Sequence, residues 1–238
     1  LSSKIVWFFP NLTKKAIEGA QYTNGNTLII GPPGQGKSVL VKYIFLWLTF
    51  LGQKILYIDP KNETVLFFKR ALDKFGHIPE FKALYQRINF VSLSSEERYR
   101  GMLDPLLFLP REEAIQTARN VLENFGEVTT DSHTASDKKT LILDSVNAVM
   151  KGKGKKHLTK VIEVIREKDP KLANLISGHN VGLGKILLGN DYSEPIRFEN
   201  QINVLGTQGL KIPTQAEIDS GRLNNEQIAG MSIMEVIM

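Results

Sequence analysis

Apolar and polar positions along the chain follow two spacings, and their order predicts a mixed fold. Short apolar runs of strand length lie at residues 27–30, 54–58, 88–93 and 202–205. Between the first two runs, residues 39–51 are long and apolar enough for a helix, and from residue 64 to 75 apolar residues recur at helical spacing. Because strand, helix and strand in this order form a βαβ unit, the sequence predicts an α/β fold with a parallel sheet.

Residues 111–178 have a different character. Their apolar positions keep a period near 3.6, and Asp169-Pro170 is typical of a helix start, with the aspartate as N-cap and the proline in the first turn. The sequence therefore predicts an all-helical subdomain, residues 111–178, inserted into a core formed by residues 1–110 and 179–238. The helix over residues 39–51 is expected to be buried on nearly all sides.

A glycine-rich segment separates the first predicted strand from the first predicted helix. Residues 31–38 read GPPGQGKS and match G-x-x-x-x-G-K-[ST] without a mismatch. Glycines let backbone N–H groups approach an anion closely, and the helix N-terminus adds unpaired N–H groups. The predicted nucleotide-binding residues are Gly31, Pro32, Pro33, Gly34, Gln35, Gly36, Lys37, Ser38 and Val39.

The chemistry of this motif assigns two side chains. Lys37 would reach the β- and γ-phosphates of ATP and stabilise charge on the transferred phosphoryl group, which makes it the candidate catalytic residue. The Ser38 hydroxyl would ligate Mg²⁺. A glycine-rich turn without a ligand is the alternative, but the complete octad between a strand and a helix favours phosphate binding.

The second strand ends in a charged segment, DPKNE. Ligands of parallel sheets bind at the carboxyl ends of strands, so Asp59 is expected to face the nucleotide or waters bound to its metal. Lys61 and Glu63 are expected to face a neighbouring subunit. A turn with a helix cap is the alternative interpretation for all three residues.

A P-loop ATPase also needs a Walker B strand, an apolar run that ends in Asp and is often followed by Glu. Two segments imitate it: Asp59 is followed by Pro60, and Asp144 is followed by Ser145 in a helical context. Neither provides the Asp-Glu pair, so we expect the Walker B strand to lie beyond Met238 and the C-terminal part of the core to be missing. This chain alone would then bind nucleotide poorly or hydrolyse it very slowly.

Composition narrows the remaining options. The chain has no cysteine, which excludes disulfides and thiolate metal sites, and its net charge of +5 permits an acidic partner without demanding one. The run at residues 39–51 is too short to cross a membrane.

The basic segment KGKGKK, residues 151–156, could contact phosphates, but a solvated connection between helices is favoured. The four histidines show no metal-ligand spacing and are interpreted as structural or surface residues: His77, His133, His157 and His179.

The order of motifs resembles a known family. G-P-P-G-Q-G-K-S is followed by K-I-L-Y-I-D-P-K-N-E, a D-P-L turn, a helical insertion, G-K-I-L-L-G-N and I-N-V-L-G-T-Q-G-L. This order, over residues 25–215, is similar to the conjugation ATPases of type IV secretion systems, the fourth VirB subunit and its TraC-like relatives, within the HerA/FtsK superfamily. These proteins usually carry Asn-Pro-Leu where this chain has Asp104-Pro105-Leu106, which leaves the role of position 104 open.

The resemblance implies a RecA-like P-loop NTPase core and a motor on the cytoplasmic face of the inner membrane. Such a motor would hydrolyse ATP as a hexamer, together with other secretion-channel subunits, to assemble a pilus or to move DNA or protein substrates. Two alternatives remain. One is a DNA translocase or coupling protein of the same superfamily, for which the sequence offers only the KGKGKK segment as a nucleic-acid contact. The other is a nucleotide-binding assembly module that does not hydrolyse ATP.

Overall fold

The computed structural model describes residues 28–128 and 133–237. The chain divides into two compact units, Leu1–Gln53 and Lys54–Met238. In the first unit, helix α1 (Lys37–Phe50) follows the glycine-rich segment. Gly52 follows its end with a φ of 70°, and its N–H donates to the carbonyl of Thr49 at 3.1 Å. The predicted helix and its glycine stop are confirmed.

Two predictions for the first unit are wrong. Residues 28–30 form no strand, and Leu28 and Ile30 are 83% and 82% exposed; residue 27 lies outside the described residues. α1 is not buried on nearly all sides, since Trp47 and Phe50 are exposed and only Phe45 and Thr49 are buried. The physical reason is the same for both. A strand needs a hydrogen-bonded neighbour and an apolar helix needs covering elements, and the described part of this unit contains no second element.

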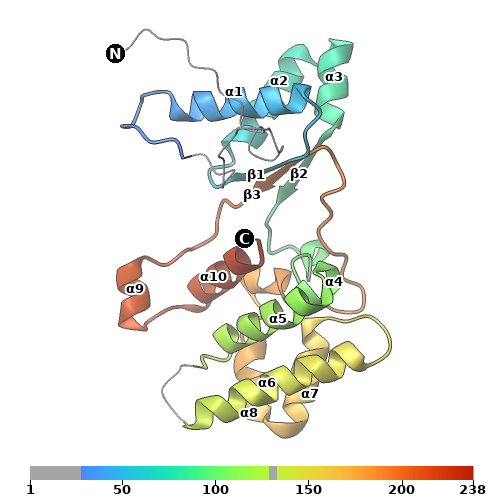
Figure 1. The fold of residues 1–238 in the computed structure, drawn as a ribbon, viewed down its shortest axis with the longest axis vertical. Helices are drawn as coiled ribbons and strands as arrows, with labels where there is room; N and C mark the ends of the chain where they lie inside the picture. The colour runs from blue at the N-terminus through green and yellow to red at the C-terminus, as the bar shows by residue number, and fades with distance from the viewer. Residues whose placement is uncertain (1–27, 129–132, 238) are drawn as a thin grey trace, which may run out of the picture. The chain divides into compact units, whose positions relative to one another are not determined.

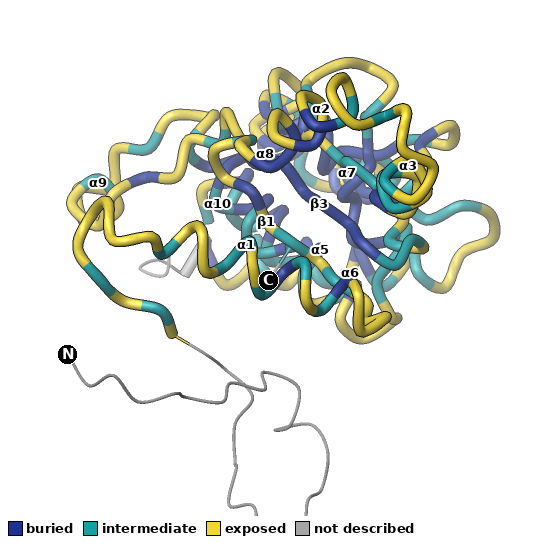
Figure 2. Tube along the Cα trace, turned by 90° about the horizontal axis from the view of Figure 1, so that it is seen from above, coloured by how far each residue is buried: buried dark blue, intermediate teal, exposed yellow. Residues whose placement is uncertain are grey.

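In the second unit, three strands form the predicted parallel sheet. They are β1 (Ile55–Asp59), β2 (Ile88–Ser92) and β3 (Ile202–Gly206), in the order β1-β3-β2. Both outer strands run parallel to β3, and Asp59 and Ser92 both lie opposite Gly206. The carboxyl ends of all three strands therefore meet at one edge. β3 is buried along its whole length and is dark blue in Figure 2.

Helices fill the rest of this unit. Along the chain, α2 and α3 come between β1 and β2, and α9 and α10 follow β3 (Figure 1). Five α-helices and two short 3₁₀ helices, η2 (Glu97–Tyr99) and η3, come between β2 and β3. Their bounds are α2 (Glu63–Phe75), α3 (Pro79–Gln86), α4 (Pro105–Phe108), α5 (Arg111–Phe125), α6 (His133–Lys151), α7 (Leu158–Lys168), α8 (Pro170–Ser177), η3 (Gly182–Ile186), α9 (Gln215–Ser220) and α10 (Asn225–Ile237).

The helical prediction for residues 111–178 is confirmed at the level of secondary structure. Asp169 caps α8 as expected, with its carboxylate accepting from the N–H groups of Lys171 and Leu172, and Asp144 lies at an exposed position of α6 rather than at a strand end. The helices α5 to α8 share one hydrophobic core with α10, η3 and Leu205 of β3. The division into core and inserted subdomain stays a prediction.

Candidate nucleotide-binding site

The backbone of the glycine-rich loop has the shape that its sequence demands. Gly34 and Gly36 both have φ of 78°, a left-handed conformation that other residues rarely adopt. A Cβ atom at either glycine would meet nothing within 4 Å. These glycines are therefore required by the backbone conformation and not by crowding, and an exposed loop that keeps two such turns leaves its N–H groups accessible.

The N-terminus of α1 continues this polar surface. Gly36 is its N-cap, so no side chain caps the first turn, and no acidic residue lies in that turn. The first helical hydrogen bond runs from the N–H of Leu40 to the carbonyl of Gly36 at 2.9 Å. The N–H groups of Lys37, Ser38 and Val39 therefore have no partner inside the helix, and with the helix dipole they favour an anion.

Lys37 lies over the loop. Its Nζ donates to the carbonyl oxygens of Gly31 at 2.5 Å and Pro32 at 2.7 Å. The side chain is half-buried, whereas the neighbouring loop residues from Pro32 to Gly36 are exposed. Two neutral carbonyls hold the ammonium group, and phosphate oxygens would be stronger acceptors for it.

The residues present fit a magnesium ion delivered with a nucleotide. Ser38 is the second residue of α1 and is exposed, so its hydroxyl is accessible. Mg²⁺ commonly takes one or two protein ligands together with phosphate oxygens and waters. Among the described residues, no group of three His, Asp or Glu side chains could hold a metal by itself. Ser38 with the nucleotide's own oxygens would therefore supply the ligands.

The carboxyl edge of the sheet holds the second group of predicted residues. Asp59 is 3% exposed, and its Oδ2 accepts from the N–H of Thr64 at 2.7 Å. Its backbone carbonyl accepts from Thr207 at 3.1 Å. Lys61 and Glu63 are exposed. One oxygen of Asp59 thus caps the first turn of α2, and roles for the three residues toward a nucleotide or a neighbouring subunit stay predictions.

Two oxygens at this edge were missed by sequence reasoning. Oδ1 of Asn62 and Oγ1 of Thr64 are buried and have no hydrogen-bond partner among the described residues. Asn62 has a φ of 58°, and a Cβ atom on Gly206 would lie 2.7 Å from its Oδ1. Buried oxygens without partners are uncommon and can accept from a ligand. The signal in the sequence was asparagine itself, which is enriched at left-handed positions.

Comparisons with known proteins agree with this fold. Residues 4–238 match the sequence model of the AAA-like domain family, which is nearly the whole chain. The chain belongs to the AAA-like domain family. An uncharacterized protein, YddE of Bacillus subtilis (strain 168), is 27% identical over 248 residues, which span 99% of this chain and 29% of that protein.

The fold of this AAA-like domain also matches a solved structure. VirB4 of Thermoanaerobacter pseudethanolicus superposes with a TM-score of 0.52 over 86% of this chain and 55% of that one, at 18% identity. The predicted resemblance to the fourth VirB subunit is thereby confirmed at the level of the fold. The chain spans about half or less of each relative. No helix among residues 28–128 and 133–237 is long and apolar enough to cross a membrane.

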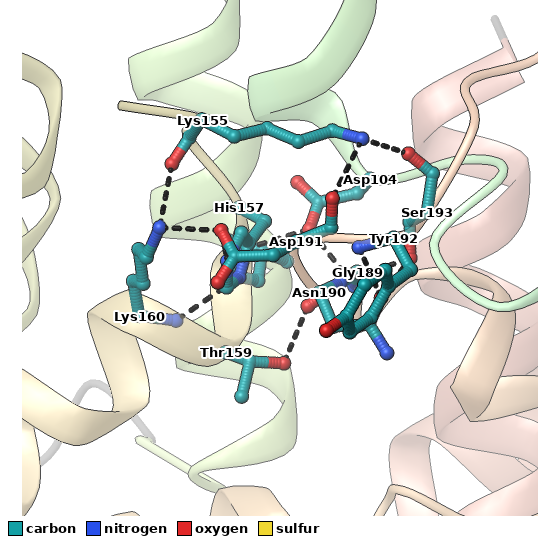
Figure 3. A network of polar contacts seen from close by, with 11 residues as sticks. Asp104, Lys155, His157, Thr159, Lys160, Gly189, Asn190, Asp191, Tyr192 and Ser193 are labelled. Atoms are coloured by element: carbon teal, nitrogen blue, oxygen red, sulfur yellow. Dashed lines mark hydrogen bonds and ion pairs between the residues drawn. The ribbon is translucent and has the colours of Figure 1, made fainter. Parts of the chain in front are cut away.

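Position 104, left open by the sequence, has a clear structural role in the AAA-like domain. Asp104 is fully buried and caps α4 by accepting from the N–H of Leu106 at 3.0 Å. Its other oxygen accepts from the N–H of Leu158 at 2.7 Å. The same oxygen accepts from the N–H of Gly189 at 3.0 Å (Figure 3). One carboxylate therefore ties together the starts of α4 and α7 and the loop after η3. Burial raises the pKa of Asp104 to about 7, although the three N–H donors oppose this rise.

Proposed function

We propose that this AAA-like domain is the ATP-binding and hydrolysing motor domain of a conjugative type IV secretion system, which powers pilus assembly or the transfer of DNA or protein substrates. The observation that carries the proposal is the glycine-rich loop: two left-handed glycines, an uncapped helix N-terminus and a lysine folded over the loop meet in eight consecutive residues. This arrangement suits a di- or triphosphate group and little else.

The chain's own residues suggest how the phosphates would be held. The N–H groups of the loop and of the first turn of α1 bind the phosphate oxygens, and the Lys37 ammonium exchanges the carbonyls of Gly31 and Pro32 for phosphate oxygens. Because Lys37 is charged and already lies over the loop, it stabilises negative charge that develops during phosphoryl transfer. Ser38 would hold magnesium, which would supply charge neutralisation at the same phosphates.

The family and the fold support the proposed setting. A hexamer at the inner face of the cell membrane, in contact with other secretion-channel subunits, would use Lys61 and Glu63 at a subunit boundary, since both are exposed at the carboxyl edge. The fold match to VirB4 supports this setting, and the chain covers only about half of that protein.

ATP binding measured by calorimetry in the presence of Mg²⁺ tests the proposal. Lys37→Ala should reduce affinity at least tenfold, because it removes the charge that faces the phosphates. Lys42→Ala, in the same helix and beyond its first turn, is the matched control and should bind like the parent chain. No binding by the parent chain, or equal loss in both variants, would contradict the proposal.

Hydrolysis separates the proposal from its alternatives. A nucleotide-binding assembly module would bind ATP through Lys37 but release no phosphate in the assembled protein. A DNA translocase of the same superfamily would hydrolyse ATP faster when duplex DNA is added. Phosphate release that is independent of duplex DNA and abolished by Lys37→Ala favours the secretion motor.

A further inference from the structure

A cavity of about 480 Å³ lies in the second unit, where the end of α5 meets the connection between α9 and α10. α10 packs against α5 (Figure 1). The described lining combines two carboxylates, an amide, a glycine and four apolar side chains: Glu123, Asn124, Glu127, Val128, Gly221, Leu223, Ile228 and Met231. Because small-molecule sites have volumes of about 300–1,000 Å³, this cavity is large enough for a small organic ligand.

Glu127 is the carboxylate of this cavity that lacks a counter-charge. Within residues 28–128 and 133–237 it forms no ion pair, whereas Oε1 of Glu123 lies 2.5 Å from Nε of Arg119. Burial lowers the pKa of His179, although Glu127 acts to raise it, so this imidazole is neutral at pH 7. The C-terminus of α5 adds the negative end of a helix dipole. The cavity therefore carries one unmatched negative charge.

The backbone at Glu127 is strained. Its φ is 48°, a left-handed conformation in which glycine is the usual residue. The turn is fixed by two hydrogen bonds, from the N–H of Glu127 to the carbonyl of Asn124 at 3.2 Å and from the N–H of Val128 to the carbonyl of Glu123 at 3.0 Å. A strained residue whose charged side chain has no partner contributes little to folding, and such strain is common at binding sites.

Contacts between α5 and α10 hold the cavity in shape. Nδ2 of Asn124 donates to Oγ of buried Ser232 at 3.3 Å and to Oε2 of Glu235 at 3.4 Å. On the apolar side Ile228 is buried and Met231 is half-buried. The charged group and the apolar surface are therefore both in place before a ligand arrives, which lowers the cost of binding.

We propose that this cavity binds an organic cation that carries one ammonium group on an apolar body, such as a primary alkylamine. The ammonium group pairs with the carboxylate of Glu127, and the apolar body lies against Leu223, Ile228 and Met231. This inference goes beyond the proposed function and does not depend on the glycine-rich loop.

The lining disfavours other ligands. The described residues around the cavity include no Lys, Arg or His, so an anion would find no counter-charge. A bare metal ion is disfavoured because no group of three His, Asp or Glu side chains in the described part of the chain could hold one. An organic cation satisfies both the unmatched carboxylate and the apolar side of the cavity.

Calorimetry with hexylamine, titrated into the full chain at constant ionic strength, tests the proposal. Hexylamine should bind about tenfold or more tightly than ethylamine, because its additional methylenes are buried. Hexanoate has an apolar body of similar length and the opposite charge, and it should not bind. Glu127→Gln should weaken the affinity for hexylamine about tenfold, because the charged partner of the ammonium group is lost.

Two further variants separate binding from folding. Glu112→Gln removes the same charge from an exposed glutamate in the first turn of α5 and should bind hexylamine like the parent chain. Glu127→Gly should lose binding as Glu127→Gln does, and its midpoint of urea unfolding should stay the same or rise, because glycine adopts the left-handed φ without strain.

Four outcomes would overturn the proposal. They are no binding of hexylamine by the parent chain, equal affinity for hexylamine and hexanoate, equal loss of binding in Glu112→Gln, and binding of a basic peptide through Glu127 that hexylamine does not displace. Glu127→Gln should bind ATP with Mg²⁺ like the parent chain, so failure of this test and failure of the ATP-binding test are distinguishable.

Discussion

Two of the Asp-Pro dipeptides of the second unit, Asp59-Pro60 and Asp104-Pro105, each lie before a helix, but only Asp104 is the helix N-cap, and their surroundings differ. Asp59-Pro60 ends β1 at the carboxyl edge, where the carboxylate accepts from one N–H and two nearby side-chain oxygens have no partner among the described residues. Asp104-Pro105 begins α4, where the aspartate accepts from three N–H groups that come from three segments. The carboxyl edge of the sheet has oxygen acceptors without donors, which a ligand could use. The contacts of Asp104 with the N–H groups of Leu106, Leu158 and Gly189, which we call the Asp104 clamp, are fully satisfied, which is typical of a structural centre.

The largest effect on stability is expected when a substitution breaks the Asp104 clamp. Asp104→Ala leaves three buried N–H groups without an acceptor and should lower the free energy of unfolding by about 3 kcal/mol or more. Asp169→Ala is the matched control, because the carboxylate of Asp169 caps only its own helix, α8. This variant should lower the free energy of unfolding by about 1 kcal/mol. Urea unfolding measures both. Equal losses would show that the contacts to Leu158 and Gly189 contribute little.

The next effect concerns the charge of the Asp104 carboxyl group. The pKa of Asp104 rises from 3.8 to about 7 on folding because of burial, so between these values the folded chain keeps a proton that the unfolded chain has released. Stability from this group is therefore present at low pH and falls as pH rises toward 7, by at most about 1.4 kcal/mol per pH unit, and then levels off.

Asp104→Asn isolates this contribution. The difference in unfolding free energy between the parent chain and Asp104→Asn should change between pH 4.5 and 7 and stay constant above 8. Taking the difference removes the opposite trend of His157 and His179, whose pKa values are lowered mainly by burial. Parallel curves over the whole range would contradict the raised pKa of Asp104.

A smaller effect on stability is expected at Asp59, at the carboxyl edge of the sheet. Asp59→Asn keeps an acceptor for the N–H of Thr64, so the free energy of unfolding should change by less than about 1 kcal/mol. If Asp59 also orients the nucleotide or its metal-bound waters, this variant weakens Mg²⁺-dependent ATP binding while stability is retained. A large loss of stability would instead place Asp59 with Asp104 as a structural centre.

The smallest effect is expected at Asn62. Asn62→Gly relieves a left-handed φ of 58° and removes a buried oxygen without a partner, so stability should change by less than about 0.5 kcal/mol. Asn62→Ala keeps the unfavourable φ and should be less stable than Asn62→Gly by about 1 kcal/mol. Thermal unfolding compares the two variants. Greater stability of the alanine variant would show that the left-handed conformation is not required.

Local sequence determined the features whose partners are near in the chain. The glycines of the P-loop motif predicted the left-handed turns at Gly34 and Gly36, and Asp169-Pro170 predicted the start of α8, because caps and turns are made by neighbouring residues. Apolar runs likewise predicted β1, β2 and β3, and the alternation of strands with helices predicted that the strands run parallel.

Tertiary structure alone decided what depends on distant residues. The carboxylate of Asp104 accepts from the N–H groups of Leu158 and Gly189, which are 54 and 85 residues away. No local sequence pattern marks these two donors. The run at residues 28–30 and the apolar helix α1 were expected to be buried, yet burial requires neighbours that a periodic pattern cannot provide. The hydrogen bond from Nζ of Lys155 to the carbonyl of Asp191 likewise joins segments 36 residues apart. Hydrogen bonds between remote segments and the covering of apolar faces are properties of the folded chain, because each depends on groups that only folding brings together.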